Sequence, residues 1–302
     1  MTESFTCNLC PRRCNALRGE TGHGFCGMGA DPVLARAALH FDEEPVISGQ
    51  SGSGAVFFSG CSLQCVFCQN YGISHEKFGR KISVEQLKQV YRDLIAQGAN
   101  NINLVNPTHF AHAVLRSLDE KPGVPVIYNC GGYERVETLR ALADKIDVYL
   151  PDLKYIDGGF SERYSGASDY FANAAPALQE MLRQVGPVQI GPDGLIQKGV
   201  IVRHLILPGR AGESMRILRW IHDNLPGAWV SLMAQYLPMG RAADYPPLDR
   251  RITQAEYDRV VDYMLKLGME DGFLQELSSA EETYVPKFDL SGVPEVDTGR
   301  DA

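Results

Sequence analysis

Three cysteines lie close together in the chain, at Cys61, Cys65 and Cys68. They follow an apolar, strand-like run at 55–58, so we expect their sulfurs on the loop that leaves a β-strand. Three thiolates on one loop can ligate three irons of a four-iron, four-sulfur cluster. No fourth cysteine lies near in sequence, which leaves one iron open to another ligand. The spacing therefore predicts a cofactor for chemistry that amino-acid side chains cannot do by themselves.

Disulfides and zinc are the other common uses of clustered cysteines. The start of the chain has neither the basic segment nor the apolar stretch of a secretory signal, and no run is long enough to cross a bilayer. We therefore expect a cytoplasmic protein, in which clustered cysteines more often bind metals than form disulfides. A zinc loop is the alternative, although structural zinc usually takes two pairs of ligands.

Composition indicates a globular enzyme. The chain has 302 residues, of which 44% are hydrophobic and 22% charged, enough for one large domain with smaller additions. The net charge is −8 and no block of lysine or arginine stands out, which makes nucleic acid an unlikely main partner.

Apolar β-type runs alternate with helical patterns through most of the chain. We expect strands at 55–59, 102–105, 124–128, 146–150, 200–207 and 228–233, with a further short apolar run at 273–277. We expect helices at 84–95, with Ser83 as its cap, and at 109–118, 134–143, 170–184, 214–224 and 254–267. This alternation predicts parallel βαβ units in a barrel or an open α/β sheet.

Polar clusters follow the predicted strands. Asn106 to His109 follow the second strand, residues 129–133 the third and residues 152–154 the fourth, and Arg203 lies within the fifth. Functional groups in such folds gather at the carboxyl ends of the strands. The clusters therefore predict one site, shared with the cysteine loop.

The motif Cys61-x-x-x-Cys65-x-x-Cys68, with an aromatic residue before its last cysteine, resembles the cluster-binding motif of the radical S-adenosylmethionine (SAM) superfamily. The resemblance implies a partial (β/α)6 barrel of parallel strands. It also implies that SAM chelates the open iron. An electron from the cluster then cleaves SAM to a 5′-deoxyadenosyl radical, which removes hydrogen from a substrate.

Residues 54–240 are similar to the pyruvate formate-lyase activating enzymes. The family's Gly-Gly-Glu-like segment is replaced here by residues 106–109, whereas its Asp-x-Lys segment is present. The residues that this resemblance places at SAM are Asn106, His109, Asn129, Asp152, Lys154 and Arg203. Lys154 supplies a point charge and Arg203 a planar fork for the SAM carboxylate. We expect the loss of either one to weaken SAM binding more than it disturbs the fold.

The resemblance favours an activating enzyme that installs a radical on a glycine of a partner protein. A low-potential flavodoxin or ferredoxin is the electron donor that it implies. One alternative is a radical SAM enzyme that modifies a small molecule, peptide or RNA, and a further one is a non-catalytic iron–sulfur redox protein. Cys130, at the end of the third strand, is either a buried core residue or a substrate-facing one.

The first 50 residues differ from the rest. They carry Cys7, Cys10, Cys14 and Cys26 in a glycine-rich stretch with little apolar material, so a metal is the natural way to hold it together. Zinc is the simplest metal, and a second iron–sulfur cluster is the alternative. A similar segment precedes the barrel in a less characterised branch of the activating-enzyme relatives.

We therefore divide the chain into three parts. A metal-binding module and linker occupy 1–50, the barrel occupies 51–280 and a tail occupies 281–302. Within the tail we expect residues 284–288 to pack across the barrel or to meet the substrate, and 295–302 to be disordered.

Overall fold

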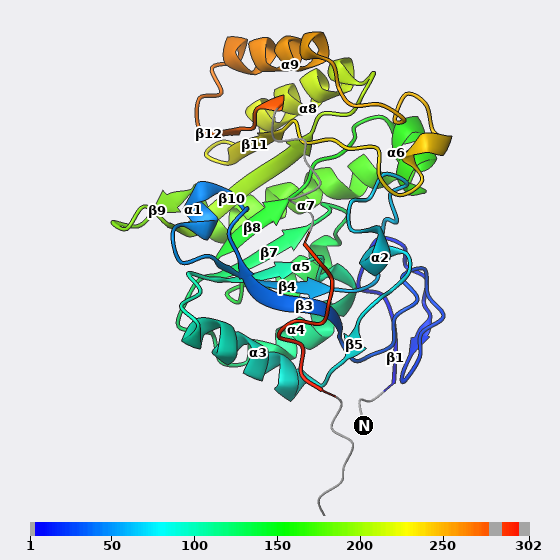
Figure 1. The fold of residues 1–302 in the computed structure, drawn as a ribbon, viewed down its shortest axis with the longest axis vertical. Helices are drawn as coiled ribbons and strands as arrows, with labels where there is room; N and C mark the ends of the chain where they lie inside the picture. The colour runs from blue at the N-terminus through cyan, green and yellow to red at the C-terminus, as the bar shows by residue number, and fades with distance from the viewer. Residues whose placement is uncertain (1–3, 278–285, 296–302) are drawn as a thin grey trace, which may run out of the picture.

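The computed structural model describes residues 4–277 and 286–295, and its centre is a mostly parallel β-sheet (Figure 1). The sheet order is β12-β11-β10-β8-β7-β6-β4-β3-β5. Its strands are β3 (Val33–His40), β4 (Ser53–Phe58), β5 (Arg80–Lys81), β6 (Ile102–Val105), β7 (Val126–Cys130), β8 (Val148–Pro151), β10 (Ile196–Leu205), β11 (Trp229–Met233) and β12 (Gly272–Leu274). A short strand β9 (Gln189–Ile190) pairs with β10, and β1 (Phe5–Thr6) pairs with β2 (Leu17–Arg18).

The predicted α/β class with a parallel sheet is confirmed. From β4 to β12 all neighbours on the main path are parallel, whereas β3 and β5 are antiparallel. The parallel part thus has seven strands (β4, β6, β7, β8, β10, β11 and β12) rather than the six we expected. Within the described residues the two edges, β12 and β5, do not pair with each other, so the sheet is open.

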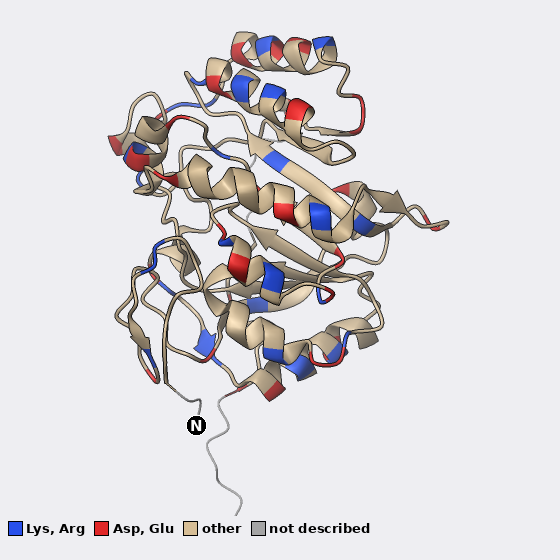
Figure 2. Cartoon of the chain, turned by 180° about the vertical axis from the view of Figure 1, so that it is seen from behind, with Lys and Arg blue, Asp and Glu red and all other residues tan. Residues whose placement is uncertain are grey.

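The longer helices lie behind this sheet in the view of Figure 1. The α-helices are α1 (Pro45–Ser48), α2 (Tyr71–Ser74), α3 (Val84–Ala96), α4 (Ala111–Ser117), α5 (Val136–Ala141), α6 (Gly158–Ser165), α7 (Tyr170–Val185), α8 (Ala211–Asn224) and α9 (Gln254–Lys266). Two 3-10 turns lie at Thr108–Phe110 and Ala242–Asp244. Figure 2 shows basic and acidic residues interspersed along the helices at the back, in agreement with the absence of a basic block in the sequence.

Helix α3 shows why the local predictions succeeded. It begins after Ser83, whose side chain accepts a hydrogen bond from the backbone of Gln86 at 3.1 Å, while the Gln86 side chain accepts one from the Ser83 backbone at 2.9 Å. This reciprocal pairing satisfies two backbone donors that the first turn leaves free. The buried face of the helix includes Leu87, Val90 and Leu94.

Several elements of the fold were not predicted, among them β3 and α6. Strand β3 lies in the stretch that we assigned to the metal-binding module and linker, yet it pairs with β4, so the central sheet begins before residue 50. Helix α6 lies between β8 and α7, where we expected no element. The predicted helix at 109–118 is divided into the turn Thr108–Phe110 and α4.

The described part of the tail, residues 286–295, runs beside β3 (red in Figure 1). Leu290 N donates to Ala35 O at 3.0 Å, and Ala37 N donates to Ser291 O at 2.8 Å. The ring of Phe288 packs edge-on against Phe57, with centroids 5.6 Å apart. This packing lies next to the sheet, as we expected for part of 284–288. Residues 284–285 and 296–302 lie outside the described residues.

In the parts of the chain that the structure describes, no helix is both long enough and apolar enough to cross a membrane.

Candidate active site

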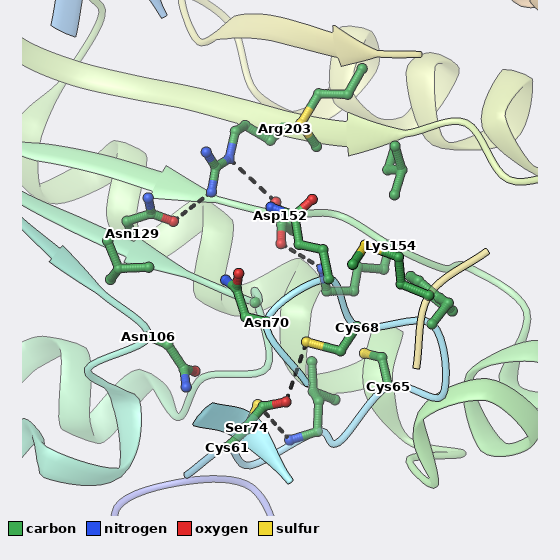
Figure 3. Close-up of a pocket in the computed structure, with 18 of the residues that line it drawn as sticks. Cys61, Cys65, Cys68, Asn70, Ser74, Asn106, Asn129, Asp152, Lys154 and Arg203 are labelled. Carbon is green, nitrogen blue, oxygen red and sulfur yellow. Dashed lines mark hydrogen bonds and ion pairs between the residues drawn. The ribbon is translucent and has the colours of Figure 1, made fainter. Parts of the chain in front are cut away.

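A cavity opens at the carboxyl ends of the parallel strands (Figure 3). Its empty space, counted with the open mouth, is about 1150 Å³. The predicted site residues that line it are Cys61, Cys65, Cys68, Asn106, Asn129, Asp152, Lys154 and Arg203. Residues from five strand ends, separated by up to about half of the chain, therefore meet as the sequence predicted.

The three cysteine sulfurs each accept a hydrogen bond. Cys61 Sγ accepts from Leu63 N at 3.3 Å, Cys65 Sγ from the Ser165 hydroxyl at 3.0 Å, and Cys68 Sγ from the Ser74 hydroxyl at 3.3 Å. Burial raises the pKa of the Cys68 thiol to about 12, and neighbouring Cys65 adds to the effect. Burial also raises the pKa of Cys65, against the charge of Lys154. A metal that binds these thiols must therefore displace their protons.

The cysteine loop is held from outside by Arg12 of the N-terminal segment. Its guanidinium donates to Ser62 O at 2.8 Å, to Ser165 O at 3.0 Å and to Gly166 O. The same group lies 3.8 Å from the centre of the Phe25 ring. Arg12 thus joins the cysteine loop to the end of α6.

A buried network of charges lines the opposite wall. Lys154 Nζ lies 2.5 Å from Asp152 Oδ2, and Arg203 Nε lies 3.4 Å from Asp152 Oδ1. The two terminal nitrogens of Arg203 bind Glu43 Oε2 at 3.0 Å and Asn129 Oδ1 at 2.6 Å. Figure 3 shows the contacts of Arg203 with Asn129 and Asp152.

The electrostatics keep this network ionised. Burial by itself would raise the pKa of Asp152, but the charges of Lys154 and Arg203 outweigh it, so the pKa lies below its usual value. Burial by itself would lower the pKa of Lys154 and Arg203. The charge of Asp152 raises the pKa of Lys154 instead, and the charges of Glu43 and Asp152 raise the pKa of Arg203. Neighbouring Glu44 differs, because its pKa is raised by burial.

Three predicted residues have protein partners that the sequence did not indicate. Both terminal nitrogens of Arg203, which lines the cavity, contact the protein: one contacts Glu43 and the other Asn129. His109 does not line the cavity: it is buried under the cysteine loop, with Nε2 2.7 Å from Ser59 O, and burial lowers its pKa to about 3. Asn106 lines the cavity, with its side chain donating to Gly60 O at 2.6 Å.

Cys130 lies at the cavity wall but is buried. Burial, with the nearby carboxyl of Glu134, raises the pKa of the Cys130 thiol well above its usual value. Glu134 accepts hydrogen bonds from Thr108 at 2.5 Å and from Tyr128 at 3.3 Å. The burial of Cys130 in this core agrees with the first of the two alternatives, that Cys130 is a buried core residue.

The sequence interpretation missed Glu43, Asn70, Ser74 and Ser165 as site residues. Asn70 and Ser74 follow the motif closely, so their proximity to the last cysteine was a usable signal. Glu43 and Ser165 lie in segments without a motif, and no local pattern marks them.

The four N-terminal cysteines lie near one another. Cys7, Cys10 and Cys26 are buried, Cys14 is exposed, and none forms a disulfide. The pKa of Cys10 is raised to about 12 by burial, with contributions from Cys26 and Cys7. Across residues 4–277 and 286–295, no three Cys, His, Asp or Glu side chains are arranged to hold a metal ion, and this applies equally to the motif cysteines. The N-terminal metal therefore stays a prediction.

Comparison with known proteins identifies the family. The sequence profile of the Radical SAM superfamily matches residues 55–233. The uncharacterized protein MJ0674 of Methanocaldococcus jannaschii is 29% identical over 276 residues, which cover 87% of this chain and 75% of that protein.

Two solved structures match the chain at low sequence identity. Streptococcus suis SuiB bound to precursor peptide SuiA matches with a TM-score of 0.49 and 12% identity, over 73% of this chain and 48% of SuiB. Methylornithine synthase (PylB) matches with a TM-score of 0.46 and 18% identity, over 68% of this chain and 59% of PylB. The chain thus spans about half of the length of SuiB.

Proposed function

Because the chain belongs to the radical SAM superfamily, we propose that it removes a hydrogen atom from its substrate with SAM bound at a cluster on Cys61, Cys65 and Cys68. When bound, the cluster supplies the electron that cleaves SAM to a 5′-deoxyadenosyl radical, the species that removes the hydrogen. The observation that carries the proposal is the meeting of three thiols and a polar wall in one cavity.

The residues present fit both groups. The three sulfurs face one cavity and each has an N–H or O–H donor, the usual surroundings of cluster thiolates. The remaining cysteine at the wall, Cys130, packs in the core at the end of β7, away from the cysteine loop in sequence, so we propose three protein ligands. Asn70 Oδ1 is buried without a hydrogen-bond partner, so this acceptor is free for an ammonium or a hydroxyl of SAM.

The same geometry assigns roles to the wall. We assign Lys154 to the SAM carboxylate as a point charge, because it lines the same cavity as the three cysteines. Asp152, Asn129 and Asn70 offer acceptors for the SAM amino group and ribose hydroxyls. Arg203 orients Asn129 and Asp152 rather than binding SAM directly.

The rest of the cavity wall is mostly apolar, which favours a substrate whose reacting carbon lies in an uncharged group. It is formed by Ile73, Val105, Leu205, Met233, Gln235, Tyr236, Leu237 and Met239. Among the described residues, the cations at this cavity are Lys154, which we assign to the SAM carboxylate, and Arg203, which is paired with Glu43 and Asp152. No further lysine or arginine among the described lining residues is left for an RNA phosphate. An apolar group with a few hydrogen-bonding atoms is the substrate moiety that suits this wall.

Within this class we favour a small molecule or a peptide as the substrate, because the apolar wall suits such a substrate, whereas the activating-enzyme function rests on sequence resemblance. Phe288, from the segment that runs beside β3, packs in one cluster with Phe57, Ile73 and Val105. Ile73 and Val105 line the cavity, so this segment lies behind one of its walls.

The experiment is anaerobic reconstitution with iron and sulfide, reduction, and measurement of 5′-deoxyadenosine formed from SAM. We propose a flavodoxin or ferredoxin as the natural donor, and dithionite replaces it in this assay. Cleavage that a small molecule or peptide stimulates, and that Cys61→Ala abolishes, would support the proposal. A radical formed on an added glycyl-radical protein would favour the activating enzyme. SAM binding without cleavage, with every substrate tried, would favour the iron–sulfur redox protein.

We also propose that Cys7, Cys10, Cys14 and Cys26 bind a second metal, either zinc or the iron of a second cluster. Their proximity and the burial of three of them support this. Metal analysis of the triple variant Cys61→Ala/Cys65→Ala/Cys68→Ala tests it, because only the N-terminal metal should remain. A triple variant that retains neither zinc nor iron would refute a second site.

A further inference from the structure

Two buried serines donate to the motif sulfurs from outside the motif. Ser165, the last residue of α6, is 2% exposed, and its hydroxyl lies 3.0 Å from Cys65 Sγ. Ser74, the last residue of α2, is 3% exposed, and its hydroxyl lies 3.3 Å from Cys68 Sγ (Figure 3). Buried hydroxyls that face a thiolate are charge-assisted donors.

Each serine hydroxyl has a second partner that orients it toward the sulfur. Tyr155 OH lies 2.9 Å from Ser165 Oγ, and His75 Nδ1 lies 2.8 Å from Ser74 Oγ. A serine carries one donor hydrogen, so when that hydrogen points at sulfur the second partner must be the donor to the serine oxygen. Such chains of donors polarise one another and strengthen the final bond.

The pairing of Ser165 with Cys65 also has a mechanical support. Arg12 donates to Ser62 O on the cysteine loop and to Ser165 O on α6, at 2.8 Å and 3.0 Å. One guanidinium therefore holds the donor and the acceptor segments together, although Ser165 and Cys65 are separated by 100 positions.

Reduction adds negative charge to an iron–sulfur cluster, and hydrogen bonds to its sulfurs stabilise that charge. We propose that Ser165 and Ser74 are positioning residues that raise the reduction potential of the cluster through their hydrogen bonds to Cys65 and Cys68. This inference rests on the cluster assignment of the proposed function. Its consequence is that a physiological donor can reduce the cluster more readily than it could without the two hydroxyls.

The test is a redox titration of the reconstituted wild type, Ser165→Ala and Ser74→Ala, in which the EPR signal of the reduced cluster measures the degree of reduction. The matched control is Ser161→Ala, because Ser161 lies on the same helix, is 1% exposed and bonds to Gly158 O at 3.1 Å instead of to sulfur. At the midpoint potential of the wild type, we expect the ratio of reduced to oxidised cluster to fall about threefold to tenfold in each test variant. The control should keep the wild-type ratio.

Iron content is measured first, so that a variant which fails to hold the cluster is recognised. In that case Tyr155→Phe, which keeps Ser165 and removes only the donor behind it, should show a smaller shift in the same direction. An unchanged potential in Ser165→Ala and Ser74→Ala with full iron, or an equal shift in Ser161→Ala, would overturn the inference. The titration uses neither SAM nor substrate. A shifted potential in a protein that never cleaves SAM would therefore support this inference and refute the proposed reaction.

Discussion

Arg203→Met should destabilise the fold, which reverses what we expected from the sequence. The guanidinium is 18% exposed and contacts Glu43, Asn129 and Asp152 at 3.0, 2.6 and 3.4 Å. Its removal leaves two carboxylates, 9% and 17% exposed, with Lys154 as the remaining cation of the network. Breaking a buried ion pair by removing one partner costs about 3–5 kcal/mol, and the partial exposure here favours about 3 kcal/mol.

Lys154→Met is the matched comparison. Its side chain is 22% exposed, and Asp152 would still have Arg203 beside it, so we expect a loss of about 1–2 kcal/mol. A second comparison also removes the charge of Glu43, the carboxylate that Arg203→Met leaves without its partner. Glu43→Gln combined with Arg203→Met should be destabilised by less than the sum of the two single variants.

The assay is urea unfolding of the iron-free proteins at pH 7, followed by circular dichroism, together with SAM binding to the reconstituted proteins. We expect Arg203→Met to lower the free energy of unfolding most and Lys154→Met to weaken SAM binding most. If Arg203→Met unfolds within about 0.5 kcal/mol of the wild type while its affinity for SAM falls, Arg203 is a ligand residue and the structural role is refuted.

Three further changes test other parts of the structure. Burial raises the pKa of Glu134 to about 7, above its value of 4.5 in the unfolded chain. The preference of the folded protein for the protonated carboxyl therefore contributes fully to stability below about pH 4.5, and this contribution is lost as the pH rises through 7. Glu134→Gln should therefore gain stability relative to the wild type between pH 5 and 8, by up to about 3 kcal/mol in urea unfolding, and parallel pH profiles would contradict this. Arg12→Lys keeps the charge but loses the planar fork that contacts Ser62 O and Ser165 O. A chelator should therefore remove iron from this reconstituted variant faster than from the control Arg13→Lys, whose site is exposed. Equal rates would show that Arg12 does not hold the cysteine loop in place. Ser83→Ala should cost about 1 kcal/mol in thermal unfolding without changing SAM cleavage, whereas Ser83→Asp should retain the cap.

Local patterns were enough for most elements. Strand β6 has the predicted bounds, and α3 begins at the predicted cap, because alternation, apolar spacing and capping act over a few residues. Strand β3 was missed for the opposite reason. Its run Leu-Ala-Arg-Ala-Ala-Leu has good helix formers, and it is a strand because it pairs with β4 on one side and meets residues 286–295 on the other.

The sequence by itself determined the chemistry of this protein. The spacing of Cys61, Cys65 and Cys68 is local, and the topological rule for parallel strands brought Asn129, Asp152 and Lys154 to the same cavity. It also determined the family, because the motif and the strand order are read along the chain.

The tertiary structure decided what each side chain does. Arg203 meets Glu43 across 160 positions, and Ser165 meets Cys65 across 100. Neither pair has a local signal, since hydrogen-bond and ion-pair partners are chosen by the packing of whole elements. The arginine that we expected at SAM therefore contacts three side chains of the protein, and a serine from a helix that we did not predict donates to a motif sulfur.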